Sequence, residues 1–390
     1  MVLVGTGLFG GCQGSGTDPE AERPLDAALV AEGKDIFRFD TFGNETYWTD
    51  TLRIHEAIQS AVSPGVALQV GLKVDVDALP EAVKAAILAG QVDLNDPAVT
   101  LTLLKLNAVL GVKGVVETVG GRDTLSRVGI TCALCHSAVD DSFAPGIGRR
   151  MDGWPNRDLN VGAIVALSPA VAPGLKAILR SWGPGKYDPR INFDGKNTPL
   201  VLPPAYGLRN VELETFTGDG PVSYWNAYVA VTQMHGQGNF SDSRLGVNIT
   251  RTPDLVTPKL PALREYQLSL VAPPPPAGSF DVAAADRGRA VFAGKARCAT
   301  CHLPGSGFTD VNLGRLHAPA ETGVDPAYAQ RTVTKQYRTT PLRGLWQHPP
   351  YFHDGSAATL MNVVSHYDRV LGLGLTGVER ADLVEYLKSL

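Results

Sequence analysis

The sequence predicts a mainly α-helical protein in which an extra helical N-terminal region precedes two small domains with long loops and one shared cysteine motif. Three observations support this prediction. The pattern Cys-x-x-Cys-His occurs at residues 132–136 and again at 298–302. Helix-forming segments flank the second copy, and 42 glycines and 28 prolines imply long ordered connections. A chain of 390 residues suits two or three domains.

Residues 1–25 are interpreted as a leader and tether. Small residues precede Cys12 and a Gly/Ser stretch follows it, as in a bacterial lipoprotein cleavage site, although the segment before it is short and lacks Lys and Arg. We therefore expect an exported chain, periplasmic or at the cell surface, with a membrane tether through Cys12. The alternative is an ordinary exposed cysteine. No other segment approaches the roughly 20 apolar residues of a membrane span.

Residues 26–125 are expected to form the helical extension. Pro80 lies in the first turn of a helix over 79–88, and an apolar run continues over 99–110. A glycine-rich stretch then leads to the first motif domain, 126–278, which ends in the stiff proline run 273–276. The second motif domain, 279–390, is expected to open and close with helices at 283–292 and 377–390.

The two motifs indicate covalently attached haem. Two cysteines three residues apart lie on one face of a helical turn and reach the vinyl groups on one porphyrin edge, and the next histidine gives a ring nitrogen to iron. Zinc would need four ligands, and neither motif has a second Cys pair or a His-x-x-x-His nearby. We therefore expect two haem c groups, bound by Cys132, Cys135 and His136, and by Cys298, Cys301 and His302.

Four short segments carry a family resemblance: Thr340–Leu345, Pro350–Gly355, Thr359–Leu360 and Val363–Tyr367. They resemble the C-terminal half of bacterial dihaem cytochrome c peroxidases, whose superfamily also holds the MauG-type enzymes and the dihaem rubber oxygenases. Lys196–Pro199 is similar to the family's Arg-Asn-x-Pro. The resemblance implies two cytochrome c-like haem domains, whereas residues 26–125 match no part of the peroxidase core.

The resemblance also implies a ligand set at the second haem. An iron with two protein ligands passes electrons, whereas an iron with an open face can bind peroxide or oxygen. Tyr367 stands where the peroxidases carry a distal methionine, as in the MauG-type enzymes. His366 and Met361 are the alternative ligands. The alternative role for Tyr367 is that of a packed helix residue whose hydroxyl meets a propionate. Arg343 is expected to pair with a propionate of this haem, as is Arg338.

At the first haem the resemblance implies an open iron. The peroxidases carry a displaceable histidine before Asn-x-Pro, and residues 184–196 contain none. Their Pro-x-Glu-Met stretch aligns best with Thr232–Gly236, which puts Gln233 in place of the catalytic glutamate. Glutamine donates a hydrogen bond but cannot shuttle a proton. His235 is expected to take that role, to ligate the iron, or to be a hydrogen-bonded wall residue, so Gln233 and His235 are the predicted catalytic pair.

Further positions are assigned by the resemblance or by composition. Phe216 and Trp225 are candidates for an aromatic side chain between the haems. Asn197 and the carbonyl oxygens of His348 and Pro350 match calcium positions of the peroxidases, so Ca²⁺ is a possible cofactor. Residues 145–160, dense in Arg, Asn and Asp, are expected to cover the edge of the first haem and pair with its propionates.

These residues predict a dihaem c-type cytochrome oxidoreductase with peroxide or oxygen chemistry at an open first haem. The alternative is a non-enzymatic dihaem electron carrier with both irons six-coordinate, and a third reading is a gas-sensing module. A small redox protein or a quinol-linked donor or acceptor is the expected partner. A net charge of −4 without a long basic run argues against nucleic acid.

Overall fold

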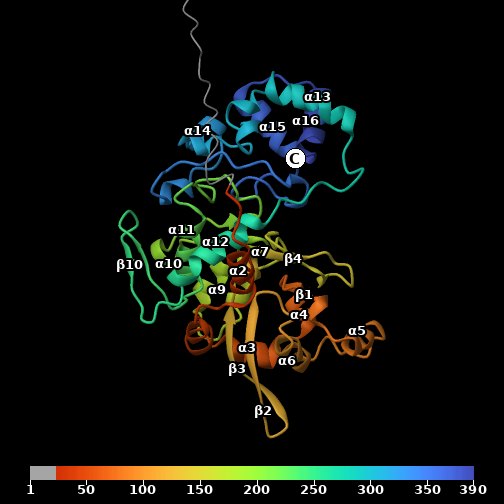
Figure 1. The fold of residues 1–390 in the computed structure, drawn as a ribbon, viewed down its shortest axis with the longest axis vertical. Helices are drawn as coiled ribbons and strands as arrows, with labels where there is room; N and C mark the ends of the chain where they lie inside the picture. The colour runs from red at the N-terminus through yellow and green to blue at the C-terminus, as the bar shows by residue number, and fades with distance from the viewer. Residues whose placement is uncertain (1–22) are drawn as a thin grey trace, which may run out of the picture.

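The computed structural model describes residues 23–390, so the expectation for Cys12 lies outside the described residues. Helices dominate this range and strands form only two-stranded sheets, which confirms the mainly α-helical class. The helices α13, α15 and α16 lie at one end of the long axis, and α3, α6 and a long β-hairpin lie at the other (Figure 1). Between residues 23 and 390 no helix is both long and apolar enough to cross a membrane.

The N-terminal layer consists of short helices with local stop and start signals. Asp26 and Asp96 accept hydrogen bonds from backbone N–H groups of the first turns of their helices, and Ser63 does the same before Pro64. The expected helix near Pro80 begins at Glu81. The elements are α2 (Ala27–Phe39), η1 (Thr46–Thr51), α3 (Ile54–Ala61), α4 (Pro64–Gln69), η2 (Val76–Ala78), α5 (Glu81–Leu88) and α6 (Pro97–Lys105).

The last part of the region expected to be helical is a β-hairpin. Strands β2 (Val112–Val119) and β3 (Arg122–Ile130) pair antiparallel and extend away from the body of the molecule. Gly120 and Gly121 form the turn with positive φ angles of 60° and 80°, the backbone that a two-residue hairpin turn requires. The expectation of a helical extension up to residue 125 is wrong for this part, and the glycine-rich stretch predicted over 111–121 contains a strand and its turn. The β-branched residues that precede the glycine pair favour a strand.

Short helices and strand pairs surround the first motif. Most of the strand pairs are local, but β1 with β5 joins the N-terminal layer to the loop after the motif. The helices are α7 (Ala133–His136), α8 (Val161–Val165), α9 (Pro173–Arg180), α10 (Ile191–Asp194), α11 (Val222–Tyr228), η3 (Val229–Gln233), η4 (Thr257–Lys259) and α12 (Leu260–Ser269). The strands are β1 (Val74–Asp75), β4 (Ser137–Val139), β5 (Ile147–Gly148), β6 (Arg150–Asp152), β7 (Lys186–Tyr187), β8 (Leu200–Val201), β9 (Phe240–Asp242) and β10 (Val247–Ile249).

Longer helices enclose the second motif. Thr359 and Thr376 cap α15 and α16, each through a reciprocal capping box with the residue three positions later. Both helices expected at the ends of this region are present. The elements are α13 (Val282–Ala293), η5 (Cys298–Thr300), η6 (Pro304–Ser306), η7 (Val311–Leu313), α14 (Pro319–Thr322), η8 (Ala329–Arg331), η9 (Leu345–Gln347), α15 (Leu360–Leu371) and α16 (Gly377–Lys388).

Two helix crossings in the molecule use the same close contact. Helix α2 packs on α12 at Gly33, where a Cβ atom would lie 1.9 Å from the carbonyl oxygen of Ala262. Helix α13 packs on α16 at Gly288, where a Cβ atom would lie 2.0 Å from the carbonyl oxygen of Asp382. Only glycine permits backbones to approach this closely, so each crossing depends on its glycine.

The aromatic packing beside the two crossings is also the same. Phe37 follows Gly33 by four residues and packs edge-on against Tyr266, with ring centroids 5.4 Å apart. Phe292 follows Gly288 by four residues and packs edge-on against Tyr386 at 5.2 Å. The pairs α2/α12 and α13/α16 are therefore equivalent packing units. In the sequence, helices α3 to α6 and the hairpin lie between α2 and the first motif.

Candidate haem sites

The histidine of the first motif is held by a backbone carbonyl. His136 ends α7, and its Nδ1 lies 3.1 Å from the carbonyl oxygen of Pro203. Because a carbonyl oxygen only accepts, Nδ1 carries the hydrogen and Nε2 keeps its lone pair. Burial lowers the pKa of His136 to about 4, so the ring is neutral. A neutral imidazole with a fixed Nδ1–H and a free Nε2 is the form that binds a metal ion.

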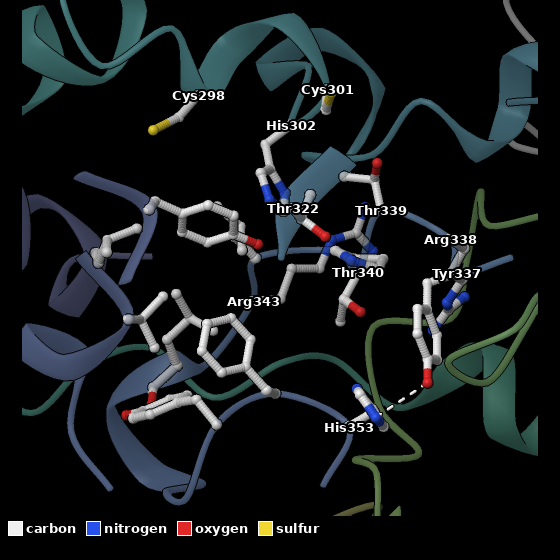
Figure 2. Close-up of a pocket in the computed structure, with 18 of the residues that line it drawn as sticks. Cys298, Cys301, His302, Thr322, Tyr337, Arg338, Thr339, Thr340, Arg343 and His353 are labelled. Carbon is white, nitrogen blue, oxygen red and sulfur yellow. Dashed lines mark hydrogen bonds between the residues drawn. The ribbon is translucent and has the colours of Figure 1, made fainter. Parts of the chain in front are cut away.

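The second motif repeats this arrangement. The Nδ1 of His302 lies 3.0 Å from the carbonyl oxygen of Phe308, which again leaves Nε2 free. Burial lowers the pKa of His302 below its ordinary value. Figure 2 shows the His302 ring pointing from the motif into the pocket, with Cys298 and Cys301 beside it. Two separate loops therefore present a cysteine pair and a metal-binding histidine in the same way.

The environments of the cysteines argue against a redox dithiol and against a structural zinc site. The four described cysteines form no disulfide with one another. Burial raises the pKa of Cys132 and of Cys135 to about 12, whereas a reactive dithiol needs a lowered pKa. Among the described residues one group of three potential ligands, Cys301, Asp310 and His317, gathers within 4.8 Å. A structural zinc site needs four ligands, and this group supplies three.

A large cavity opens beside the second motif. Its volume is about 300 Å³, and apolar side chains from α13, α15 and α16 line much of it, including those of Phe292, Leu360, Val364 and Leu383. Cys298, Cys301 and His302 line the same cavity. A concave apolar site with a few polar groups is the usual environment of a bound cofactor. The residues present therefore fit a flat apolar ring attached at the cysteines and ligated by His302.

Of the three candidate distal ligands at the second motif, Tyr367 alone lines this cavity. Removal from water raises the pKa of Tyr367 to about 12, and the thiols of Cys298 and Cys301 are close enough to contribute. His366 instead has Nε2 2.8 Å from the carbonyl oxygen of Thr322. Met361 is exposed on α15. The role of Tyr367 as ligand stays a prediction, and its rivals lie outside the cavity.

The predicted propionate partners also reach the cavity. Arg343 donates from Nη1 to the backbone carbonyl oxygens of Gly207 and Arg209, and burial lowers its pKa. Arg338 forms an ion pair with Glu214 at 3.0 Å, and its Nε has no partner. In Figure 2 both arginines lie below His302, Arg343 near the centre of the view and Arg338 toward its right edge. Their pairing with propionates stays a prediction.

Arg157 is the residue of the loop 145–160 that lines the large cavity, and composition alone did not single it out. The backbone N–H of its neighbour Asn156 donates to the carbonyl oxygen of Cys135 at 2.9 Å, which places the loop at the first motif. The Nε and Nη1 atoms of Arg157 are buried without a partner, and the side chain lines the large cavity. Burial lowers its pKa to about 10. A buried guanidinium without a counter-ion is costly, so this position fits an anionic group such as a propionate.

The predicted catalytic residue Gln233 is tied into a hydrogen-bond network. Its Oε1 accepts a hydrogen bond from the hydroxyl of Tyr187 at 2.5 Å, and its Nε2 donates to Thr232 and Asn192. Tyr187 packs beside Cys135 in the same hydrophobic cluster. The structure therefore brings Gln233 close to the first motif through Tyr187. Sequence reasoning missed Tyr187, since a tyrosine in a two-residue strand carries no motif.

His235 lies beside this network in an unusual backbone conformation. Its φ angle is 61°, in the left-handed region that non-glycine residues rarely adopt. Its ring stacks on Tyr47 with a centroid distance of 3.6 Å and an interplanar angle of 18°. Burial, and secondarily the charge of Arg251, lower the pKa of His235 to about 4. Tyr47 was missed because the N-terminal layer resembles nothing in the peroxidase core.

The residues predicted to lie between the haems and to bind calcium are found in different surroundings. Phe216 lines the large cavity, 6.4 Å between ring centroids from His353. Trp225 instead packs in the core around α11 and α12. The side-chain oxygen of Asn197 accepts a hydrogen bond from Trp182 at 2.7 Å, while His348 and Pro350 line the cavity. The calcium assignment stays a prediction.

Sequence comparisons place the chain near one group of curated proteins. No protein-family model matches it. The methylamine utilization protein MauG of Methylorubrum extorquens is 32% identical over 121 residues, and that of Methylophilus methylotrophus is 31% identical over 122 residues. Each match covers 27% of this chain and 34% or 36% of the relative, so it spans about a third of those proteins. These matches confirm the resemblance to the MauG-type superfamily over that part of the chain.

Two solved structures share distant likeness with the chain. Hydrazine synthase of Kuenenia stuttgartiensis, pressurised with xenon, aligns with a TM-score of 0.35 and 20% identity over 50% of this chain and 73% of that chain. A MauG-like protein associated with microbial copper homeostasis aligns with a TM-score of 0.36 and 21% identity over 50% and 74%.

Proposed function

We propose that this chain is a dihaem c-type cytochrome oxidoreductase. One haem would be attached at Cys132 and Cys135 with His136 as ligand, and the other at Cys298 and Cys301 with His302. The observation that carries the proposal is the matched geometry of the two histidines, each with Nδ1 bound to a backbone carbonyl and Nε2 free beside a cysteine pair. The similarity to MauG proteins supports the same class.

We further propose that two equivalent cytochrome c-like units hold these haems. The second unit spans 279–390, as the sequence suggested. The first would begin with α2 and close with α12, because that pair repeats the glycine crossing and the aromatic contact of α13 with α16. Helices α3 to α6 and the hairpin are then an insertion between α2 and the first motif. In this division the first haem unit begins at α2, whereas the sequence analysis placed its start at residue 126.

The first site would carry the chemistry. Haem at His136 supplies an iron that can bind and reduce peroxide or oxygen. Tyr187 and Gln233 form a hydrogen-bonded pair near Cys135 of the motif, and Gln233 would orient the phenol because both ends of its amide are engaged. His235 is neutral at physiological pH, so its ring can accept a proton from an incoming hydroperoxide and return it to the departing oxygen.

The second site would pass or store electrons. Tyr367 is the candidate distal donor that faces the cavity beside His302. An anionic oxygen donor stabilises ferric iron and lowers the reduction potential relative to a methionine. Electrons would come from or go to a small redox protein or a quinol-linked partner. Export and a tether at Cys12 are proposed from the sequence alone.

The spin states of the oxidised protein test this proposal. We expect electron paramagnetic resonance to show a high-spin first haem and a low-spin second haem. We expect peroxide to react without prior half-reduction of the protein. Variants His235→Ala and Gln233→Ala should slow that reaction without changing the second haem. If both haems are low-spin and do not react with peroxide, the proposal of an enzyme is wrong and the chain is an electron carrier with two six-coordinate irons.

A further inference from the structure

A second cavity lies behind the first motif, between the motif and the N-terminal layer. Its volume is about 70 Å³. Ile54 of α3, Leu104 of α6 and Ile130 of β3 line it, together with Leu134 of the motif. The cavity is therefore separate from the space beside His302 and belongs to the interface that the inserted layer makes with the first site.

The side chains that line this cavity have no free hydrogen-bond donor for a water molecule. Its two side chains with polar hydrogens are both engaged: Thr100 donates from Oγ1 to the carbonyl oxygen of Val62 at 2.8 Å, and Trp48 donates from Nε1 to that of Met234 at 3.1 Å. A buried water needs two to four polar partners, whereas cavities lined by apolar groups stay dry and take up small apolar guests. This cavity is of the second kind.

Few side chains separate the cavity from the residues proposed to act at the first haem. Leu134 lies between the two cysteines that attach that haem. The ring of Trp48 is 6.2 Å from that of Tyr47, and Tyr47 stacks directly on His235. A guest in the cavity thus contacts Leu134 of the motif, and Trp48 and Tyr47 separate it from His235.

We propose that this cavity binds a dioxygen-sized apolar molecule and stores it beside the first haem. The inference rests on the proposed function, since it requires an open iron at His136. It favours dioxygen over peroxide as the oxidant, because peroxide is polar and would lose its hydrogen bonds to water on entering a lining without free polar groups. The inserted N-terminal layer acquires a role here, because it supplies one wall of the cavity.

Xenon under pressure probes the cavity in the haem-loaded protein. The variant Ala67→Leu fills the cavity from α4, where Ala67 is buried and lines it. Ala57→Leu is the matched control, since Ala57 is half-buried on α3 in the same layer but does not line the cavity. We expect one xenon site here in the parent and in Ala57→Leu, and its loss in Ala67→Leu. Val74→Leu, which fills the cavity from β1, replaces Ala67→Leu if that variant does not fold.

Ligand kinetics then test the storage role. Dioxygen and carbon monoxide should associate more slowly with the reduced first haem of Ala67→Leu, whereas the rate with peroxide should match the parent. No xenon at this position in the parent overturns the inference whatever the coordination at His136. Xenon binding with unchanged dioxygen association overturns the storage role. Xenon binding next to a first haem that takes no ligand overturns the proposed function and the storage role together, but leaves the binding site standing.

Discussion

Replacing Arg157 with methionine tests the haem assignment through the sign of a stability change. The Nε and Nη1 atoms of this side chain are buried without a partner, and the charge effects on it come from Tyr206 and Tyr351 and not from a carboxylate. Without an anion beside it, the buried guanidinium lowers the free energy of unfolding. With a propionate beside it, the same group is half of a buried ion pair.

The two cases differ in sign and by several kcal/mol. An unsatisfied buried donor costs about 1–3 kcal/mol, so two such atoms cost about 2–6 kcal/mol. If Arg157 has no anion, Arg157→Met relieves this cost and raises the free energy of unfolding by up to that amount. Breaking a buried ion pair costs about 3–5 kcal/mol, so the same substitution lowers the free energy of unfolding if a propionate is the partner.

Urea denaturation of the haem-loaded protein, followed by circular dichroism, measures the change. We expect a lower midpoint with an unchanged slope for Arg157→Met. Arg149→Met is the control, because Arg149 belongs to the same loop but is exposed, and it should leave the midpoint where it was. A higher midpoint for Arg157→Met would refute the reasoning, since it would mean that the loop brings no anion to this guanidinium.

Three further predictions follow from single sites. Replacing Cys132 and Cys135 with alanine should remove one of two haems, and a matured chain that keeps both or neither in its mass spectrum would contradict the assignment. Tyr367→Phe should raise the potential of the second haem or make it high-spin in resonance spectra, while His366→Gln and Met361→Leu, outside the cavity, should change neither. Hydrogen bonds from Arg244 and Tyr224 hold the pKa of Asp242 at about 2, below an unfolded value of about 4. Its stabilisation is therefore complete above pH 4 and lost as the pH falls toward 2, so Asp242→Asn should flatten the acid decline in unfolding free energy. An equally steep decline in that variant would count against the ion pair.

Local chemistry explains what could be predicted from the sequence. Cys-x-x-Cys-His specifies its own geometry within five residues, and the helices α13 and α16 follow from periodicity and capping residues near the second motif. Tyr367 lines the cavity beside His302, and the sequence singled it out because the resemblance extends through its helix. The hairpin β2–β3 is missed because the sequence prediction includes its glycine pair in a longer glycine-rich stretch, although Gly-Gly after a run of β-branched residues specifies a hairpin turn.

Long-range packing explains what was missed. Helix α2 looks like the first helix of an extension because about a hundred residues separate it from the first motif, whereas in the second unit α13 is followed directly by its motif. Nothing in the local sequence of α2 identifies α12 as its partner. The sequence contains one signal for this equivalence: in both α2 and α13 a glycine is followed four residues later by a phenylalanine. This pattern is too short to be significant until the structure shows that both glycines lie at a helix crossing.

The segment between α2 and α3 contributes to the proposed first site, because it holds the backbone of His235. A non-glycine residue in the left-handed region costs about 1–3 kcal/mol and persists only where its surroundings enforce it. Here the backbone N–H of Gln237 donates to the carbonyl oxygen of Phe42 at 2.7 Å, and Trp48 donates to that of Met234. Tyr47 stacks on the ring between them. Three residues that lie between α2 and α3 thus fix the turn that carries His235, so a chain without this segment would keep both haem motifs and lose the placement of its proposed proton carrier.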